Sequence, residues 1–201
     1  MPARTGTRRL TMAAVAALAL VGGAIAANAT GAGSGGHGHG PKVVRVSLHD
    51  VDGSKVARVK LYQTRGKVVV TGHAWGLTPG FHGFHIHTVG LCEADAPNGP
   101  FTTAGGHFTG GLLTNHADHA GDMPSLLVTA DGRAFASFAT DRFTLADLRD
   151  SDGSAVMVHA GRDNFANIPS DRYASASGTV PDATTLMTGD AGARVACGVI
   201  D

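Results

Sequence analysis

The chain has 201 residues, which suits one domain with a substantial hydrophobic core. Its 16 Lys and Arg side chains balance its 16 Asp and Glu side chains, so the whole-chain charge excludes the strongly basic class of nucleic-acid-binding proteins. The composition is rich in Gly (29) and His (11) and contains one Glu, Glu93. Such a sequence favours short strands and turns over helices, and its surplus of histidine indicates metal binding.

Residues 1–29 have the order of a secretory signal. Arg4, Arg8 and Arg9 precede an apolar stretch, residues 10–25, and small residues follow it. A membrane anchor is disfavoured because this stretch is shorter than the about 20 residues that a spanning helix needs. We therefore predict cleavage near residue 29, export from the cytoplasm and no stable membrane insertion afterwards; the route, general secretory or twin-arginine, is left open. Cleavage removes three Arg and no acid, which leaves 13 basic and 16 acidic residues and a net charge of −3.

Residues 30–42 are predicted to be a flexible linker rich in Gly and His, and residues 43–201 to be the folded domain. His37 and His39 in the linker could bind metal loosely, although a solvated tail is the simpler interpretation. The chain has only two cysteines, Cys92 and Cys197. In the oxidising compartment that export implies, they favour a disulfide over a metal site.

The folded domain contains a series of short strands separated by turn signals. Alternating residues and short apolar runs predict strands at 43–49, 56–62, 68–75, 84–87, 126–129, 134–138, 155–159 and 195–200. Only residues 145–149 have weak helical character. Two long stretches without periodicity, 88–124 and 160–193, contain much of the polar chemistry. We therefore predict an all-β fold, an eight-stranded antiparallel Greek-key barrel or sandwich with two long functional loops.

A His-x-His pair lies in the fourth predicted strand. Residues two apart in a strand face the same side, so His85 and His87 project together while Phe84 and Ile86 point to the other side. Two adjacent imidazoles on an otherwise apolar strand favour metal ligation. His82 has the parity of the apolar residues and is predicted to be a hydrogen-bonded structural histidine.

Further candidate ligands follow in the first long loop and at a strand end. They are His107, His116, His119 and Asp122 in the loop, and His159 at the end of strand 155–159. Imidazole suits copper and zinc, and three histidines with one aspartate are tolerable for tetrahedral zinc. These residues suffice for two neighbouring metal sites if one imidazole is shared.

Five separate motifs resemble those of the copper–zinc superoxide dismutase family. They are HGFHIH (82–87), GGHF (105–108), HAGD (119–122), VHAGRDN (158–164) and GDAGARVACGVI (189–200). The resemblance covers nearly all of residues 43–200. It is specific, because metal ligands, cysteines and an arginine recur in the family's order in unconnected segments.

The resemblance implies a role for each matching residue. The copper ligands would be His85, His87, His107 and His159. The zinc ligands would be His107, His116, His119 and Asp122, with His107 bridging both metals as an imidazolate. Asp163 would join the two sites from behind the ligands, Cys92 would pair with Cys197, and Arg194 would lie over the copper.

The activity implied is that of an oxidoreductase, which converts two superoxide anions and protons into dioxygen and hydrogen peroxide as an antioxidant defence outside the cytoplasm. One superoxide reduces Cu(II) and leaves as dioxygen, and a second reoxidises Cu(I) and leaves as peroxide. His107 would supply a proton to the second step while zinc keeps it oriented, and Arg194 would hold the anionic substrate. Superoxide is then the expected partner, nucleic acid is not, and a homodimer is left open.

The sequence departs from the family pattern in two places. Only two residues separate His116 from His119, whereas most members have a longer loop there, and some relatives with a shortened loop work without zinc. A copper-only enzyme is therefore the alternative to a two-metal enzyme, with His116 the weakest zinc ligand. Met187 stands where animal members have a lysine that guides superoxide, so long-range guidance must come from elsewhere.

Two other kinds of function compete with this one. A copper-binding or delivery protein on the same fold would lack turnover, but such relatives typically lose copper ligands or the arginine, which this chain keeps. A structural or adhesion domain on the same scaffold would have no reason to carry six histidines at ligand spacing. Superoxide consumption by the copper-loaded protein separates the three.

Overall fold

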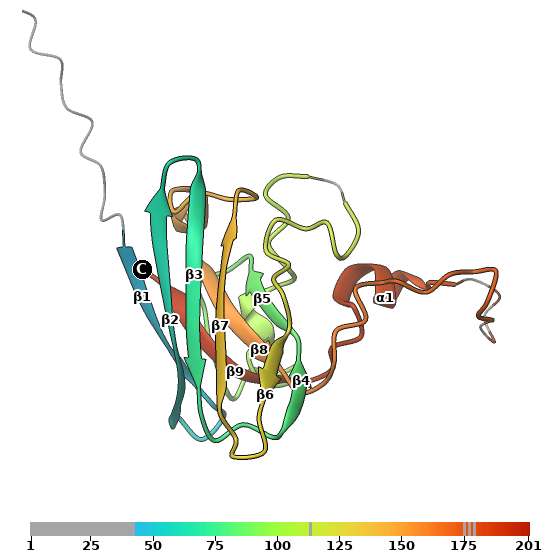
Figure 1. The fold of residues 1–201 in the computed structure, drawn as a ribbon, viewed down its shortest axis with the longest axis horizontal. Helices are drawn as coiled ribbons and strands as arrows, with labels where there is room; N and C mark the ends of the chain where they lie inside the picture. Colours follow the sequence, from blue (N-terminus) through green and yellow to red (C-terminus); the bar gives the residue numbers. More distant parts are fainter. Residues whose placement is uncertain (1–42, 113, 175, 177, 179) are drawn as a thin grey trace, which may run out of the picture. The chain divides into compact units, whose positions relative to one another are not determined.

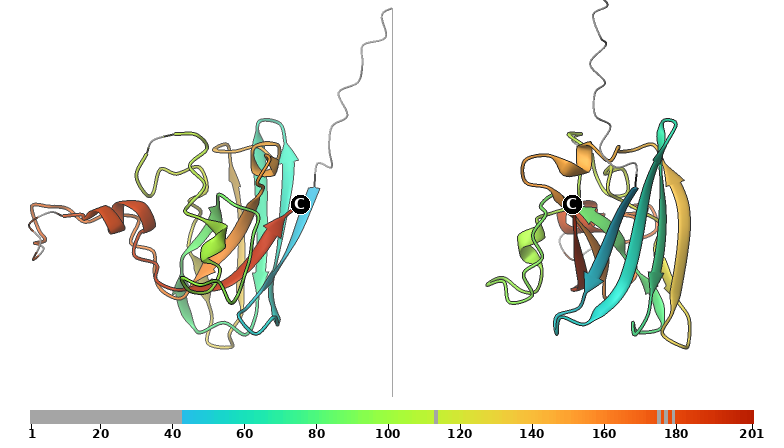
Figure 2. Two further views of the ribbon diagram at one scale, coloured as in Figure 1. Left: turned by 180° about the vertical axis from the view of Figure 1, so that it is seen from behind. Right: turned by 90° about the vertical axis from the view of Figure 1, so that its left-hand side faces the viewer.

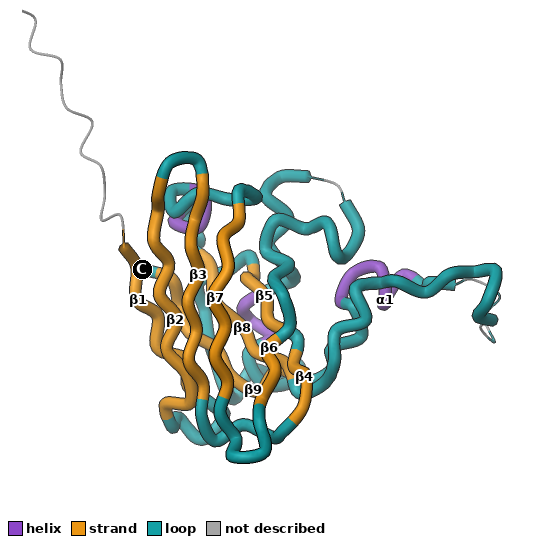
Figure 3. The backbone as a smooth tube through the Cα atoms, viewed as in Figure 1, coloured by secondary structure: helices purple, strands orange, loops and turns teal. Residues whose placement is uncertain are grey.

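The computed structural model describes residues 43–201 except 113, 175, 177 and 179. Its strands are β1 (Val43–His49), β2 (Lys55–Thr64), β3 (Lys67–Ala74), β4 (Gly80–His82), β5 (Phe84–His87), β6 (Leu126–Val128), β7 (Ala134–Thr140), β8 (Ser154–His159) and β9 (Arg194–Ile200). The 3-10 helices η1 (Thr102–Ala104) and η2 (Asp147–Arg149) and the α-helix α1 (Ala183–Thr188) lie in the connections (Figures 1 and 3). The predicted signal, 1–29, and linker, 30–42, lie outside the described residues.

The strands form one antiparallel sheet in the order β4-β6-β7-β3-β2-β1-β9-β8-β5. Its two end strands, β4 and β5, are consecutive along the chain and separated only by Gly83, so the sheet nearly closes into a barrel. A Cβ at Gly83 would lie 2.6 Å from the Cβ of Ala191 and 3.1 Å from the His85 ring, so only glycine fits here. The neighbours β3 with β7, and β1 with β9, are distant in sequence, as in a Greek key.

Alternation along the strands builds the core. Val44, Val46 and Leu48 of β1 are buried, while the residues between them are exposed or half-buried. Phe84 and Ile86 of β5 join the same apolar cluster. Each fully buried side chain of this kind stabilises the fold by about 1.5–3 kcal/mol. The core thus lies inside the barrel and leaves the outer side of β5 for the histidines.

The predicted all-β antiparallel fold is confirmed, with two differences in its elements. The strands number nine because Gly80–His82 pairs with β6 as a strand of its own. The helix α1 was not predicted, although Asp182 caps it by accepting a hydrogen bond from the Thr185 N–H at 2.9 Å and Gly189 ends it with φ of 60°. Segment 145–149 is helical only over Asp147–Arg149. Within the described residues, no helix has the length and apolar character needed to cross a membrane.

Candidate metal centre

Strand β5 presents two histidines toward the loops outside the barrel. His85 and His87 alternate with the core residues Phe84 and Ile86, yet all four are buried. The loops cover the outer side, through isolated β-bridges that join His85 to Asp122 and His87 to His107. Both imidazoles are therefore buried beneath the first long loop.

One group of histidines lies between β5, β8 and this loop. His85, His87, His107 and His159 each place one ring nitrogen within 4.8 Å of the others. His159 reaches them because β8 pairs with β5, and its Nε2 lies 3.3 Å from Nε2 of His87. The structure thus brings together the four residues predicted to bind copper.

Hydrogen bonds orient these imidazoles. His87 donates from Nδ1 to the carbonyl of Gly105 at 2.9 Å, and His159 donates from Nδ1 to the carbonyl of Gly192 at 3.0 Å. Each bond leaves the lone pair of Nε2 free to ligate a metal. His85 has the opposite arrangement, because its Nε2 lies 2.6 Å from Asp163 and its Nδ1 stays free. His82, as predicted, is a structural histidine: its Nδ1 lies 2.6 Å from the carbonyl oxygen of His159.

A second group gathers around the carboxylate of Asp122. Nδ1 of His107 lies 2.9 Å from Oδ1, and Nδ1 of His116 lies 3.0 Å from the same oxygen. Nδ1 of His119 lies 3.3 Å from Oδ2. His107 therefore presents Nδ1 to this group while its ring also belongs to the first group, as a shared imidazole would.

Of the four predicted zinc ligands, His119 is the one that lies outside the closely spaced sets of potential ligand atoms. The set around Asp122 whose potential ligand atoms all lie within 4.8 Å of one another contains His85, His107, His116 and Asp122 but not His119. His119 is nonetheless buried, and its Nε2 lies 3.1 Å from the carbonyl of Thr114, which leaves Nδ1 free on the side of Asp122. The imidazole therefore has the orientation of a ligand.

Asp163 connects the two groups. Its Oδ2 lies 2.6 Å from Nε2 of His85, and its Oδ1 lies 2.7 Å from Nε2 of His116. The N–H of Phe165 also donates to Oδ1 at 2.7 Å. One buried carboxylate thus fixes an imidazole of each group, as the sequence predicts for this residue.

Unsatisfied nitrogens test whether these residues fit two metal ions. In the described part of the chain, Nδ1 of His85, of His116 and of His119 is buried without a hydrogen-bond partner. Nδ1 of His116 approaches Asp122 but is not aligned for a hydrogen bond. Burying a polar atom without a partner costs about 1–3 kcal/mol, so three such atoms around two His clusters call for a ligand. The donor set, imidazoles and a carboxylate, suits copper and zinc.

Burial and charge control protonation in these groups. Burial, together with the neighbouring imidazoles, lowers the pKa of His107 to about 4 and that of His159 to about 3. Burial likewise holds the pKa of His87 well below its usual value. These rings are therefore neutral near pH 7, the form that ligates metals. Burial also opposes charge on His116, but the adjacent carboxylates of Asp122 and Asp163 raise its pKa to about 9, so a cation is favoured there.

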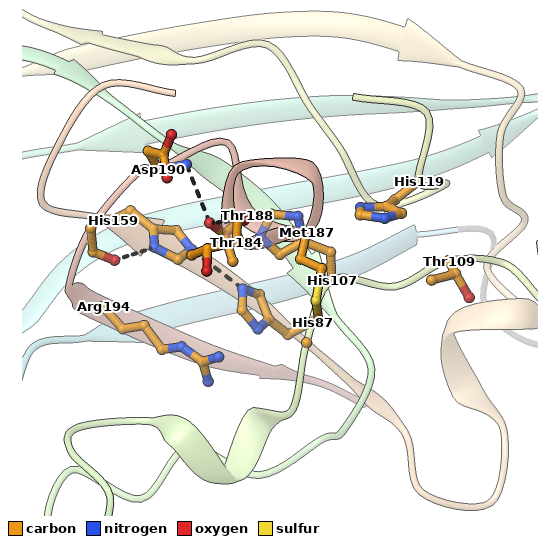
Figure 4. A pocket seen from close by; sticks show the side chains of 12 residues that line it. His87, His107, Thr109, His119, His159, Thr184, Met187, Thr188, Asp190 and Arg194 are labelled. Atoms are coloured by element: carbon orange, nitrogen blue, oxygen red, sulfur yellow. Dashed lines mark hydrogen bonds between the residues drawn. The ribbon is translucent and has the colours of Figure 1, made fainter. Parts of the chain in front are cut away.

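Arg194, at the start of β9, lies beside the first group. Its Nη1 donates to the carbonyl of Phe101 at 2.6 Å, and its Nη2 donates to the carbonyl of Gly105 at 2.7 Å. The Gly105 carbonyl is also the acceptor for His87, so one backbone group orients both side chains. Arg194 lines a cavity of about 630 Å³ that also exposes His87, His107 and His159 (Figure 4).

The predicted disulfide between Cys92 and Cys197 is confirmed. It joins the loop after β5 to the middle of β9, with a Cα–Cα distance of 5.7 Å. A small apolar cluster that includes Phe101 and Met157 packs against it. The loop that holds Arg194 by its carbonyls is therefore itself fixed to the barrel.

The sequence did not reveal the backbone carbonyls that orient the side chains of the site, nor the arginine that holds one of its loops. The carbonyls of Phe101, Gly105 and Gly192 carry no sequence signal, because any residue supplies a carbonyl. Arg142 was missed for a different reason: it lies outside the family motifs, yet its Nη1 donates to the carbonyls of Ala117 and His119 at 2.7 and 3.2 Å.

Comparison with known proteins identifies the family. Residues 56–200 match the family described as copper/zinc superoxide dismutase. The Cu-Zn superoxide dismutase of Mycobacterium tuberculosis is 47% identical over 173 residues, covering 80% of this chain and 71% of that protein. The enzyme of Photobacterium leiognathi is 36% identical over 157 residues, covering 74% and 80%.

Solved structures agree with the sequence comparison. The Cu/Zn superoxide dismutase from Brucella abortus has a TM-score of 0.60 and 28% sequence identity, covering 79% of this chain and 99% of that one. A SOD-like protein from Bacillus subtilis has a TM-score of 0.61 and 26% identity, covering 78% and 97%. The chain therefore belongs to the copper–zinc superoxide dismutase family, an oxidoreductase family whose substrate is superoxide and whose metals are copper and zinc.

Proposed function

We propose that two neighbouring metals share His107 in this superoxide dismutase. Copper would be held by Nδ1 of His85 and by Nε2 of His87, His107 and His159. Zinc would be held by Nδ1 of His107, His116 and His119 and by a carboxylate oxygen of Asp122. The observation that carries this proposal is the set of buried, unpartnered Nδ1 atoms on His85, His116 and His119, each of which faces one of the two His clusters.

The side chains around copper would bind substrate and handle its protons. When bound, copper would provide the redox chemistry by which an electron passes from one superoxide to the next. Arg194 would bind the anion in the cavity, since its guanidinium stays protonated and is held beside His87. His107 would hold a proton at Nε2 between the two half-reactions and release it to the product. Asp163 would keep the His85 ring fixed meanwhile.

Metal content tests the two-metal arrangement. Protein loaded with both metals is expected to contain one copper and close to one zinc per chain by elemental analysis, as one ion per site requires. His119→Ala should lose zinc and keep copper, whereas His49→Ala, at an exposed histidine of β1, should keep both. Copper without zinc in the native protein would make this a copper-only enzyme with His107 as an ordinary copper ligand.

We also propose that the protein is exported after cleavage near residue 29. The Cys92–Cys197 disulfide supports this, because such bonds persist mainly outside the cytoplasm. The signal-like order of residues 1–29 supports it independently. The intact mass of the protein recovered from outside the cytoplasm should correspond to residues from about 30 onward, and an uncleaved mass would contradict the proposal.

A further inference from the structure

The outer wall formed by β1, β2, β3 and β7 has an unusual charge. These four strands contain five Lys or Arg residues and no Asp or Glu. Residues 43–201 carry all 16 acids of the chain and 12 of its 16 basic residues, because Arg4, Arg8, Arg9 and Lys42 precede them. The rest of the domain therefore has seven basic residues against 16 acidic ones. A positive wall on an otherwise acidic domain needs an explanation.

The cations on this wall are crowded and unpaired. Arg45 of β1 lies directly opposite Lys60 of β2, and Arg58 is two residues from Lys60 on the same face. Like charges placed directly opposite each other destabilise a sheet. Among the described residues, none of the three forms an ion pair, since the ion pairs made by Lys or Arg there involve only Arg133 and Arg142. An external anion would relieve this repulsion.

Two hollows on the wall form one track. The first, of about 500 Å³, is lined by Arg45, Ser47, Arg58, Lys60, Thr71 and His73, with two core valines beneath. The second, of about 310 Å³, shares His73 and continues past Trp75 and Phe135 to Arg133. Phe135 is 63% exposed, and its ring centroid lies 4.9 Å from that of His73. The track thus has cations and hydroxyls side by side at one end, aromatic rings in the middle and Arg133 at the other end.

We propose that this track binds an acidic polysaccharide, a sugar polymer that carries carboxylates. Anions along the polymer would pair with Arg45, Arg58 and Lys60, while Ser47 and Thr71 would hydrogen-bond sugar hydroxyls. Phe135 would pack against the C–H face of a sugar ring. An elongated track fits a chain better than a flat bilayer, and the export proposed above, which the disulfide supports, would place the protein among envelope polysaccharides rather than nucleic acids.

Binding at this wall leaves the metal centre free. In the sheet order, β2 lies opposite the β4–β5 seam that carries the histidines, and Figure 2 shows the wall and the long loops on different sides of the barrel. The enzyme would therefore be held on its matrix by one side and receive superoxide on the other. Such binding rests on the proposed export but not on how the metals are bound.

Retention on a carboxylated polysaccharide tests the proposal. The metal-loaded protein should bind immobilised alginate at low salt, elute as salt is raised, and pass through neutral dextran. Each exposed ion pair is worth up to about fivefold in affinity, so Arg58→Gln/Lys60→Gln should bind on the order of tenfold more weakly. The matched control, Arg162→Gln/Arg172→Gln, removes two exposed cations outside the track and should bind as the native protein does.

A second variant separates sugar recognition from charge alone. Phe135→Ala should weaken alginate binding severalfold without changing its salt dependence, and all variants should keep native superoxide consumption. Equal weakening of alginate binding by Arg58→Gln/Lys60→Gln and by the control Arg162→Gln/Arg172→Gln would overturn the track as the binding site. Tighter binding to phosphatidylglycerol vesicles or to single-stranded DNA than to alginate, self-association through this wall in sedimentation, or no retention at all would overturn the polysaccharide as its occupant.

Discussion

Arg194 is held by carbonyls and not by a carboxylate. Its two bonds to Phe101 and Gly105 fix the guanidinium without neutralising it, and no acidic side chain of the described residues pairs with it. Burial lowers the pKa of Arg194 from its usual value, yet arginine stays charged at any physiological pH. The positive charge is therefore available to an anion in the cavity, in a domain that is acidic as a whole.

The effect of this charge on catalysis is predicted from Coulomb's law. At ~6 Å from superoxide it is worth about 0.7 kcal/mol in bulk water and about 2.8 kcal/mol at an effective dielectric constant of 20. Arg194→Ala should thus lose on the order of tenfold in activity, and Arg194→Glu should lose more. Raising ionic strength should slow the native enzyme more than the alanine variant, because salt screens what the mutation has removed. Full activity of Arg194→Ala at low salt, with copper content checked in parallel, would refute this role.

Arg142 supports the short loop between His116 and His119. Besides its two carbonyl acceptors, its Nη2 lies 3.8 Å from Asp118 in the same loop. On the other side, the N–H of His116 donates to the carbonyl of Leu186 in α1 at 2.7 Å. Segments distant in sequence therefore help to position this short loop.

Removing Arg142 should weaken zinc binding without removing a ligand. We expect Arg142→Gln to lose zinc to a chelator at on the order of tenfold lower chelator concentration, as is usual when a group that orients ligands is lost. Arg142→Lys should lose zinc at a chelator concentration between those of the native protein and Arg142→Gln. Arg133→Gln, which removes an exposed ion pair elsewhere, should match the native protein. The visible spectrum of the cobalt-substituted protein should shift in Arg142→Gln. Unchanged zinc retention and spectrum would show that Arg142 does not position this loop.

At the scale of elements, the disulfide and the small cluster around Phe101 determine where the loop after β5 lies. Closing a loop of 105 residues stabilises the fold by roughly 4–5 kcal/mol in the chain-entropy model. Cys92→Ser/Cys197→Ser should therefore lower the melting temperature by roughly 10 °C. It should also reduce activity severalfold while copper stays bound, because the carbonyls that hold Arg194 move, and of the proposed copper histidines only His87 is oriented by one of them. Calorimetry and activity per bound copper measure both effects; native values for both would contradict this view of the loop.

The strands were largely predictable, since alternation in segments such as 43–49 and 84–87 records which side faces the core. The split at Gly83 was not, because the break depends on the close approach of Ala191, a contact between distant segments. The helix α1 was missed because six residues are too few for a periodic signal, and only its caps, Asp182 and Gly189, mark it. Candidate ligands could be identified from their motifs, whereas their orientation depends on backbone carbonyls that no motif records.

In the molecule as a whole, the barrel separates the histidine-rich metal centre from the basic wall. The β4–β5 seam and the loops over it carry the histidines, and the opposite wall carries unpaired cations. Superoxide, an anion, approaches a domain whose remaining surface is acidic, so the local charge of Arg194 has to provide the attraction that net charge does not.

Superoxide consumption by the purified protein loaded with copper and zinc tests the central claim most directly. We predict rapid consumption by the native protein and by His49→Ala, and near-background consumption by His159→Ala, which removes a buried histidine of the proposed copper site while keeping the barrel. Metal-loaded native protein that consumes superoxide no faster than His159→Ala would contradict the account and leave a copper-binding protein on this fold.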